Sequence, residues 1–126
     1  MNKGKVPNFK SQYSIIIVTS FMKHISPEEL LQWKTTGKDH QLIDIREIYE
    51  VETCTIGGQN IPMADVIERN REIRKDVPVV FHCKSGRRSE AVVHALEQKL
   101  GLQNLFTLDG GIIAWIDKVD PSLVRY

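Results

Sequence analysis

A cysteine, a glycine and three cationic side chains lie within one short stretch near the middle of the sequence. The stretch is VVFHCKSGRRSE, residues 79–90, and its reactive group is the thiol of Cys83. The apolar start predicts a buried strand, and Ser89 is a residue type that caps helices, so Cys83 is expected in a loop between a strand and a helix. A helix N-terminus and nearby Lys or Arg favour the thiolate, which is the nucleophilic form of cysteine. These residues therefore predict a nucleophilic thiolate at Cys83.

The loop after Cys83 also has the composition of an anion-binding site. Backbone N–H groups of residues 84–89 can turn towards one point, and Gly86 allows the positive φ that a tight curl needs. The candidate binding residues are Lys84, Ser85, Gly86, Arg87, Arg88 and Ser89. The alternative is an ordinary strand-to-helix turn with solvated basic side chains and an inert cysteine. The combination of these residue types at one turn favours the anion site.

Four short apolar stretches predict the strands that place this loop. Residues 77–81 (VPVVF) are apolar throughout, as in a strand buried on both faces of a parallel sheet. Residues 41–46 and 105–108 are also typical of strands, and residues 60–62 predict a brief edge strand because proline cannot donate a ladder hydrogen bond. Asp44 and Arg46 would then lie at the carboxyl end of a strand, where α/β proteins place their ligands.

Helices are predicted between these strands, from the positions of caps, glycines and apolar residues. They are expected from the capping sequence Ser26-Pro27-Glu28-Glu29 to Gly37, over residues 47–52, over residues 64–75, from a Ser89 cap to Gly101, and after Asp109-Gly110-Gly111. The alternation of strands and helices predicts a three-layer α/β fold with right-handed crossovers.

The cysteine loop resembles that of the rhodanese family, which often reads C-x-x-G-x-R-S. Cys83, Gly86, Arg88 and Ser89 occupy those positions. LIDIRE at residues 42–47 resembles the D-x-R-E strand end of the family, and LDGGIIAW at residues 108–115 resembles its closing L-x-G-G-x-x-x-W. The likeness covers about residues 25–126 and is greatest to the rhodanese-like domain that follows the adenylating domain of MoeB- and ThiF-type proteins. It implies a rhodanese-like fold with a central five-stranded parallel sheet and helices on both faces.

The resemblance implies that Cys83 carries sulfur as a persulfide, taken from thiosulfate or a protein persulfide and passed to a thiophilic acceptor. Loop N–H groups would bind the persulfide, while Lys84, Arg87 and Arg88 would attract anionic donors. The implied partners are a small anionic donor such as thiosulfate, and a sulfur-carrier protein or adenylating enzyme, including those of molybdopterin or thiamine biosynthesis. No cofactor is expected. TCTIGG at residues 53–58 departs from the G-H-I-x-G-A of many members, so the rim of the site is expected to differ.

Two other functions use similar residues. Protein tyrosine phosphatases carry H-C-x-x-x-x-x-R-[ST], whereas only four residues separate Cys83 from Arg88. The shorter loop suits one sulfur atom and is cramped for the tetrahedral group that a phosphatase or arsenate reductase must bind. A non-catalytic rhodanese-like binding module is the second alternative. Its usual mark is a missing loop cysteine, and Cys83 is present.

Four residues outside the loop are secondary candidates. Asp44 and Arg46 are predicted to brace the loop backbone, with exposed strand-end charges as the alternative. Cys54 is interpreted as a small apolar core residue, with a resolving thiol for Cys83 as the alternative. Alternation along the strand turns the ring of His82 away from the Cys83 side chain. The four histidines and two cysteines show no metal-ligand spacing, so no metal site is expected.

Length and composition limit the remaining possibilities. A chain of 126 residues with 41% hydrophobic and 26% charged residues fits one folded domain. Seventeen Lys and Arg against sixteen Asp and Glu leave a net charge of +1, which gives no field to attract nucleic acid. The apolar run within residues 13–22 is too short to span a membrane, and two cysteines outside any CxxC pair indicate a cytoplasmic protein. Residues 1–21 are expected to form a partly ordered extension of a domain over residues 22–126.

Overall fold

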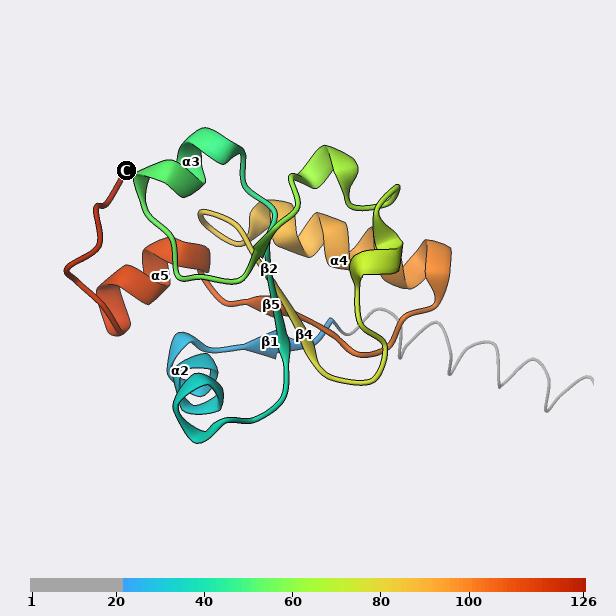
Figure 1. Cartoon of the computed structure of the whole chain (residues 1–126), viewed down its shortest axis with the longest axis horizontal. Helices are drawn as coiled ribbons and strands as arrows, with labels where there is room; N and C mark the ends of the chain where they lie inside the picture. The colour runs from blue at the N-terminus through green and yellow to red at the C-terminus, as the bar shows by residue number, and fades with distance from the viewer. Residues whose placement is uncertain (1–21) are drawn as a thin grey trace, which may run out of the picture.

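The computed structural model describes residues 22–126, which form a five-stranded sheet between two layers of helices (Figure 1). The strands are β1 (His24–Ile25), β2 (Gln41–Asp44), β3 (Gln59–Asn60), β4 (Val79–His82) and β5 (Leu105–Leu108). Their order across the sheet is β1-β5-β4-β2-β3, and every pairing is parallel. The expected three-layer α/β fold is therefore confirmed. The extension predicted over residues 1–21 lies outside the described residues.

The central strand β4 explains the unbroken apolar run in the sequence. All four of its residues are buried, because β2 and β5 pair with its two edges and helices cover both faces. Asp44 of β2 lies opposite His82 of β4 in the register. The carboxyl ends of these strands therefore meet at one edge of the sheet, and the segments that follow them share that edge.

Residues 22–126 contain four α-helices. They are α2 (Pro27–Thr36), α3 (Ile48–Thr53), α4 (Arg87–Leu100) and α5 (Gly111–Lys118). α2 begins with the predicted capping box, in which Ser26 and Glu29 exchange two side-chain to backbone hydrogen bonds of 3.1 Å. α2 and α5 pack together on one face, and α4 lies across the other (Figure 1). No helix within residues 22–126 has the length and apolar character needed to cross a membrane.

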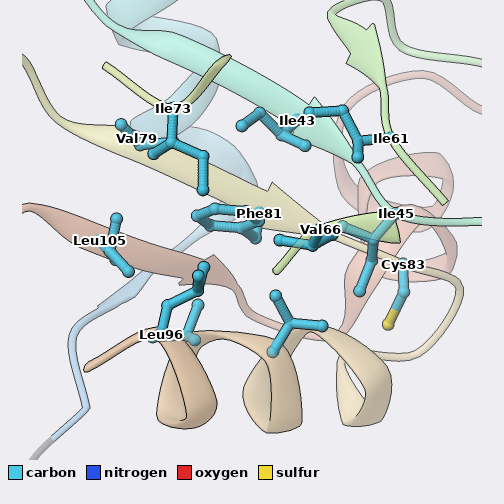
Figure 2. Packing of buried hydrophobic residues seen from close by; sticks show 12 residues of the cluster. Ile43, Ile45, Ile61, Val66, Ile73, Val79, Phe81, Cys83, Leu96 and Leu105 are labelled. Carbon is cyan, nitrogen blue, oxygen red and sulfur yellow. The ribbon is translucent and has the colours of Figure 1, made fainter. Parts of the chain in front are cut away.

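The core consists of two apolar clusters, one on each face of the sheet. The α4-side cluster (Figure 2) comprises Ile43, Ile45, Ile61, Val66, Ile73, Val79, Phe81, Cys83, Val92, Val93, Leu96 and Leu105. The α2/α5-side cluster comprises Ile25, Leu30, Leu42, Cys54, Ile56, Val80, Leu108, Ile112, Trp115 and Ile116. Successive residues of β4 point to opposite clusters, as the alternation of a strand requires.

The prediction of a charged helix over residues 64–75 is wrong. The segment forms two single turns of 3-10 helix, Met63–Asp65 and Asn70–Glu72. The Asn70 side chain donates to the carbonyl of Ile67 at 2.8 Å, a local bond that competes with a regular helix. Val66 and Ile73 are the only side chains of residues 64–75 that are buried, so a longer helix would gain little packing.

The strand β1 was not predicted from its own residues. It contains two residues, too few to show alternation, and it exists because His24 and Ile25 pair with Thr107 and Leu108 of β5. The fifth strand was expected only through the family resemblance.

Candidate active site

Cys83 directly follows β4, at the edge where the carboxyl ends of the strands meet. Its side chain is 1% exposed and belongs to the α4-side cluster together with Ile45 and Val66. Figure 2 shows the sulfur at one end of that cluster, pointing towards α4. The thiol therefore lies between the sheet edge and the start of a helix.

The prediction that Ser89 caps this helix is wrong. Gly86 is the N-cap residue, with φ 104°, and α4 begins at Arg87. Ser89 lies within the first turn, where its hydroxyl donates to the Gly86 carbonyl at 3.1 Å and lies 2.5 Å from the Thr107 hydroxyl. The physical reason is that the Cys83 sulfur accepts the hydrogen bond from the Ser89 N–H, which the side-chain oxygen of an N-cap residue would otherwise accept. The helix can therefore begin almost one turn earlier.

Two backbone N–H groups converge on the sulfur of Cys83. The Gly86 N–H donates to Sγ at 3.1 Å and the Ser89 N–H at 3.4 Å. The Ser89 hydroxyl lies 3.8 Å from the same sulfur. The other serine of the predicted binding loop, Ser85, is exposed to solvent. N–H groups at a helix N-terminus stabilise negative charge placed against them. We call these two N–H groups the sulfur cradle.

The three cations of the loop have different surroundings. The Lys84 ammonium lies 4.5 Å from the centre of the Tyr126 ring, and Arg87 is exposed. Arg88 forms a two-pronged ion pair with the Glu50 carboxylate, with N–O distances of 2.8 and 2.9 Å. Of these three cations, Arg88 alone forms an ion pair within residues 22–126. Arg88 is therefore not a free anion-binding group.

Glu50 and Tyr126 belong to the site, although the sequence did not indicate either. The Tyr126 hydroxyl donates to Glu50 at 2.9 Å and accepts a hydrogen bond from Arg46 at 2.9 Å. Hydrogen bonds from Arg88 hold the pKa of Glu50 at about 2, against the opposing effect of burial. The helix predicted over residues 47–52 already contained Glu50, and the structure adds a capping box between Glu47 and Glu50 at its start. No local signal could have indicated its contacts with Arg88 and Tyr126.

Asp44 and Arg46 form a buried ion pair next to α3. The guanidinium of Arg46, which is 0% exposed, donates to the two carboxylate oxygens of Asp44 at 2.9 and 2.7 Å. It also donates to the carbonyls of Glu50 and Cys54, at the C-terminal end of α3. Burial opposes its charge, but the bonds to Asp44 and Tyr126 outweigh burial and raise the pKa of Arg46. The Asp44–Arg46 pair was expected to brace the backbone of the cysteine loop. In the structure, Arg46 instead donates to the backbone of α3 and to Tyr126.

The N-terminus of α5 contacts the carbonyl side of the cysteine loop. The N–H of Ile112 donates to the Cys83 carbonyl at 2.9 Å, and the N–H of Ile113 donates to the Lys84 carbonyl at 3.1 Å. Gly111, with φ 60°, permits this approach, because a Cβ there would lie 2.6 Å from the Cys83 carbonyl oxygen and closer still to that of Lys84. This glycine was predicted only as part of a turn, and its contact with the loop was missed.

His82 and Cys54 lie on the opposite side of the sheet from the Cys83 sulfur. Alternation places the His82 ring on the face of Val80, and its Nε2 lies 3.5 Å from the Asp44 carboxylate. Burial lowers the pKa of His82 to about 4, against the opposing effect of Asp44, so the ring is neutral near pH 7. Cys54 belongs to the α2/α5-side cluster, so the sheet separates it from Cys83. This placement favours the interpretation of Cys54 as an apolar core residue. Residues 22–126 contain no group of His, Cys, Asp or Glu side chains that could hold a metal ion.

The Glu50–Arg88 pair predicts a specific response to acid. The pKa of Glu50 is lowered on folding, so its ionisation stabilises the folded state above the pKa of the unfolded chain, and this stabilisation is lost as the pH falls towards about 2. We expect the wild-type protein to have a higher free energy of unfolding than Glu50→Gln near neutral pH, and the difference to shrink between about pH 4.5 and pH 2. Urea denaturation at a series of pH values measures this difference.

Glu52→Gln provides the control for that titration, because Glu52 is an exposed residue of the same helix. It should not show the acid-dependent loss. A difference between wild type and Glu50→Gln that stays constant from neutral pH to pH 2 would contradict the prediction.

Comparison with known proteins gives a consistent set of relatives. A family model described as the rhodanese-like domain matches residues 26–118. The probable adenylyltransferase/sulfurtransferase MoeZ of Mycobacterium tuberculosis is 32% identical over 105 residues, a match that covers 81% of this chain and 26% of MoeZ. The chain thus spans about a quarter of the length of that relative.

Two other relatives are similar over most of their own length. YqhL, an uncharacterized protein of Bacillus subtilis, is 34% identical over 107 residues, covering 84% of this chain and 82% of YqhL. The crystal structure of a rhodanese-related protein from Thermoplasma volcanium superposes with a TM-score of 0.66 at 30% identity, covering 77% of this chain and 93% of that one.

Proposed function

The chain belongs to the rhodanese-like domain family, and from this premise we propose that it is a sulfurtransferase that carries sulfur as a persulfide on Cys83. The observation that supports this most directly is the sulfur cradle, in which the N–H groups of Gly86 and Ser89 meet at one thiol. The similarity to part of MoeZ, whose name includes sulfurtransferase, supports the same chemistry.

In the loading step, the Cys83 thiolate attacks the outer sulfur of a donor such as thiosulfate. A new S–S bond forms, the S–S bond of thiosulfate breaks, and sulfite leaves with its electron pair. The thiolate and thiosulfate carry three negative charges together, as do the persulfide and sulfite. Backbone N–H groups at the cradle stabilise the persulfide because they are already aligned with the sulfur.

In the unloading step, a nucleophilic acceptor bonds to the outer sulfur of the persulfide. The electron pair of the S–S bond returns to Cys83, which becomes a thiolate again. Cyanide can serve as the acceptor in an assay and gives thiocyanate. For the physiological acceptor we propose the adenylated carboxyl terminus of a sulfur-carrier protein, made by a separate adenylating enzyme. This terminus is an electrophile, so here the outer sulfur of the persulfide attacks its carbonyl carbon, the C–O bond to the phosphate breaks, and AMP leaves with the electron pair. Two cellular thiols then reduce the resulting acyl disulfide, which returns Cys83 to a thiol and releases the thiocarboxylate.

The remaining site residues have supporting roles in this proposal. Lys84 and Arg87 attract an anionic donor, and the backbone of residues 84–89 binds the transferred sulfur. Asp44 and Arg46 support the loop indirectly, because their hydrogen bonds fix α3 and Tyr126. No cofactor takes part, and neither nucleic acid nor a membrane is proposed as a partner. The two free cysteines agree with a reducing compartment, and we propose a cytoplasmic location.

The proposal predicts that incubation with thiosulfate adds the mass of one sulfur atom to the intact protein. Cys83→Ser should gain nothing, because the nucleophile is absent, whereas Cys54→Ser should gain sulfur like the wild type. Cyanide should remove the added mass and release thiocyanate. Intact-protein mass spectrometry measures each of these outcomes.

Loading of Cys83→Ser to the wild-type level would contradict the proposal, as would a folded wild-type protein that takes up no sulfur from thiosulfate or from glutathione persulfide. In the second case the non-catalytic binding module becomes the preferred function. Hydrolysis of p-nitrophenyl phosphate would then test the phosphatase alternative.

A further inference from the structure

The Glu50–Arg88 pair links α3 to the first turn of α4, next to the reactive thiol. Arg88 is the second residue of α4, one position before the N–H that donates to the sulfur. Its guanidinium binds both carboxylate oxygens of Glu50, at 2.8 and 2.9 Å. The Glu50 side chain is 6% exposed and that of Arg88 is 34% exposed. The carboxylate is therefore fixed in the protein, while the guanidinium remains partly open to solvent.

Glu50 is fixed in place by contacts that do not involve Arg88. The Tyr126 hydroxyl donates to one carboxylate oxygen at 2.9 Å, and the backbone N–H of Glu47 donates to the other at 3.0 Å. Tyr126 is in turn bonded to the buried guanidinium of Arg46. If Arg88 turned towards a bound anion, Glu50 could not follow it. An anion that uses Arg88 must therefore compete with Glu50.

The pair also changes the charge that an incoming molecule meets. Lys84, Arg87 and Arg88 surround the loop with three positive charges, and Glu50 balances that of Arg88. Hydrogen bonds to Glu50 raise the pKa of Arg88. Arg88 directly precedes Ser89, whose N–H donates to the Cys83 sulfur, so the ion pair lies beside the reactive loop. A negative charge this close to the thiol opposes the approach of anions.

We propose that Glu50 is a specificity-determining residue, which weakens the attraction of the Cys83 site for small anions by pairing with Arg88. As applied to sulfur donors, this inference rests on the proposed function. The site then binds multiply charged donors such as thiosulfate more weakly. It favours donors in which a persulfide carries one negative charge. Glu50 acts through Arg88 and touches no reacting atom, so it is a positioning residue.

Alkylation of Cys83 tests this inference without requiring sulfur transfer. Iodoacetate and iodoacetamide have nearly the same shape, but iodoacetate carries one negative charge and iodoacetamide none. The rate at Cys83 with iodoacetate divided by the rate with iodoacetamide therefore reports the local electrostatic field. In Glu50→Gln this ratio is expected to rise about three- to tenfold over the wild type, because one nearby negative charge is removed. Peptide mass analysis separates the modification of Cys83 from that of Cys54.

Glu52→Gln is the matched control, since it removes the same charge from an exposed position of the same helix. Its ratio should stay within about 1.5-fold of the wild type, because exposed charges are strongly screened. Glutamine at position 50 can still accept the Glu47 N–H, as capping boxes with glutamine do, so α3 should keep its conformation. Circular dichroism at the assay temperature verifies that Glu50→Gln is folded.

The donor measurement then applies the inference to the proposed function. Glu50→Gln should lower KM for thiosulfate about threefold or more, keep kcat within about twofold, and make kcat/KM fall more steeply with salt. A merely structural role would instead lower kcat for every donor.

The outcomes separate the two proposals. An alkylation ratio in Glu50→Gln that equals or falls below that of Glu52→Gln overturns the role of Glu50, whether or not the protein transfers sulfur. A raised ratio in a protein that takes up no sulfur supports the role of Glu50 in anion selection and overturns the proposed function.

Discussion

Gly111→Ala is expected to abolish sulfur loading of Cys83 and to destabilise the protein by about 4 kcal/mol. Gly111 has a positive φ, which alanine adopts at a cost, and the new Cβ would meet the carbonyl groups of Cys83 and Lys84. Backbone atoms cannot rotate away as a side chain can, so either the loop or α5 must move. Movement of either one breaks the bonds from the Ile112 and Ile113 N–H groups and displaces the sulfur from its cradle.

Gly101→Ala is the matched control for this change. Gly101 has a similar φ of 67°, but a Cβ there would meet no atom within 4 Å. We expect the free energy of unfolding of Gly101→Ala to fall by about 1 kcal/mol from conformational strain alone, and this variant to load sulfur normally. Urea denaturation and intact mass after thiosulfate treatment provide the two measurements. Equal losses in the two variants would show that the close approach at Gly111 is unimportant.

Arg46→Met is expected to destabilise the protein by about 4 kcal/mol, since it leaves the buried Asp44 carboxylate without its partner. The variant also loses the hydrogen bonds to the carbonyls of Glu50 and Cys54 and to the Tyr126 hydroxyl. The end of α3 is therefore expected to loosen, together with the position of Glu50. The free energy of unfolding from urea denaturation measures this effect.

A second substitution tests whether the buried charge is the reason. Asp44→Leu combined with Arg46→Met should be at least as stable as Arg46→Met alone, because the unpaired carboxylate is removed as well. Arg69→Met breaks an exposed ion pair with Glu72 and should leave stability nearly unchanged. Additive losses from Asp44→Leu and Arg46→Met would contradict this explanation.

The sequence predicted features that depend on neighbouring residues. The run around Val80 indicated a buried central strand, the residues from Ser26 to Glu29 indicated a capping box, and Gly101 indicated the end of a helix. Each depends on a local pattern, and each is present in the structure. The prediction for residues 64–75 was wrong although it used the same kind of local pattern. Its charged residues suggested a helix, whereas the Asn70 side chain donates to the carbonyl of Ile67.

Features that depend on distant contacts could not be predicted in this way. The partner of Arg88 is Glu50, 38 residues earlier, and Tyr126 reaches the same carboxylate from 76 residues later. Both contacts exist only once α3, α4 and the C-terminal segment lie together. Ser89 was assigned the wrong role for a related reason, because the acceptor that replaces it belongs to the preceding strand end.

The sulfur of Cys83 accepts hydrogen bonds from the Gly86 and Ser89 N–H groups at the start of α4, and this couples chemistry to secondary structure. A change in the charge of the sulfur alters the stability of the first helical turn, and by reciprocity any distortion of that turn alters the energy of the charged sulfur. The helix and the nucleophile are thus one thermodynamic unit. Local unfolding of this turn and loss of reactivity at the thiol should be the same event.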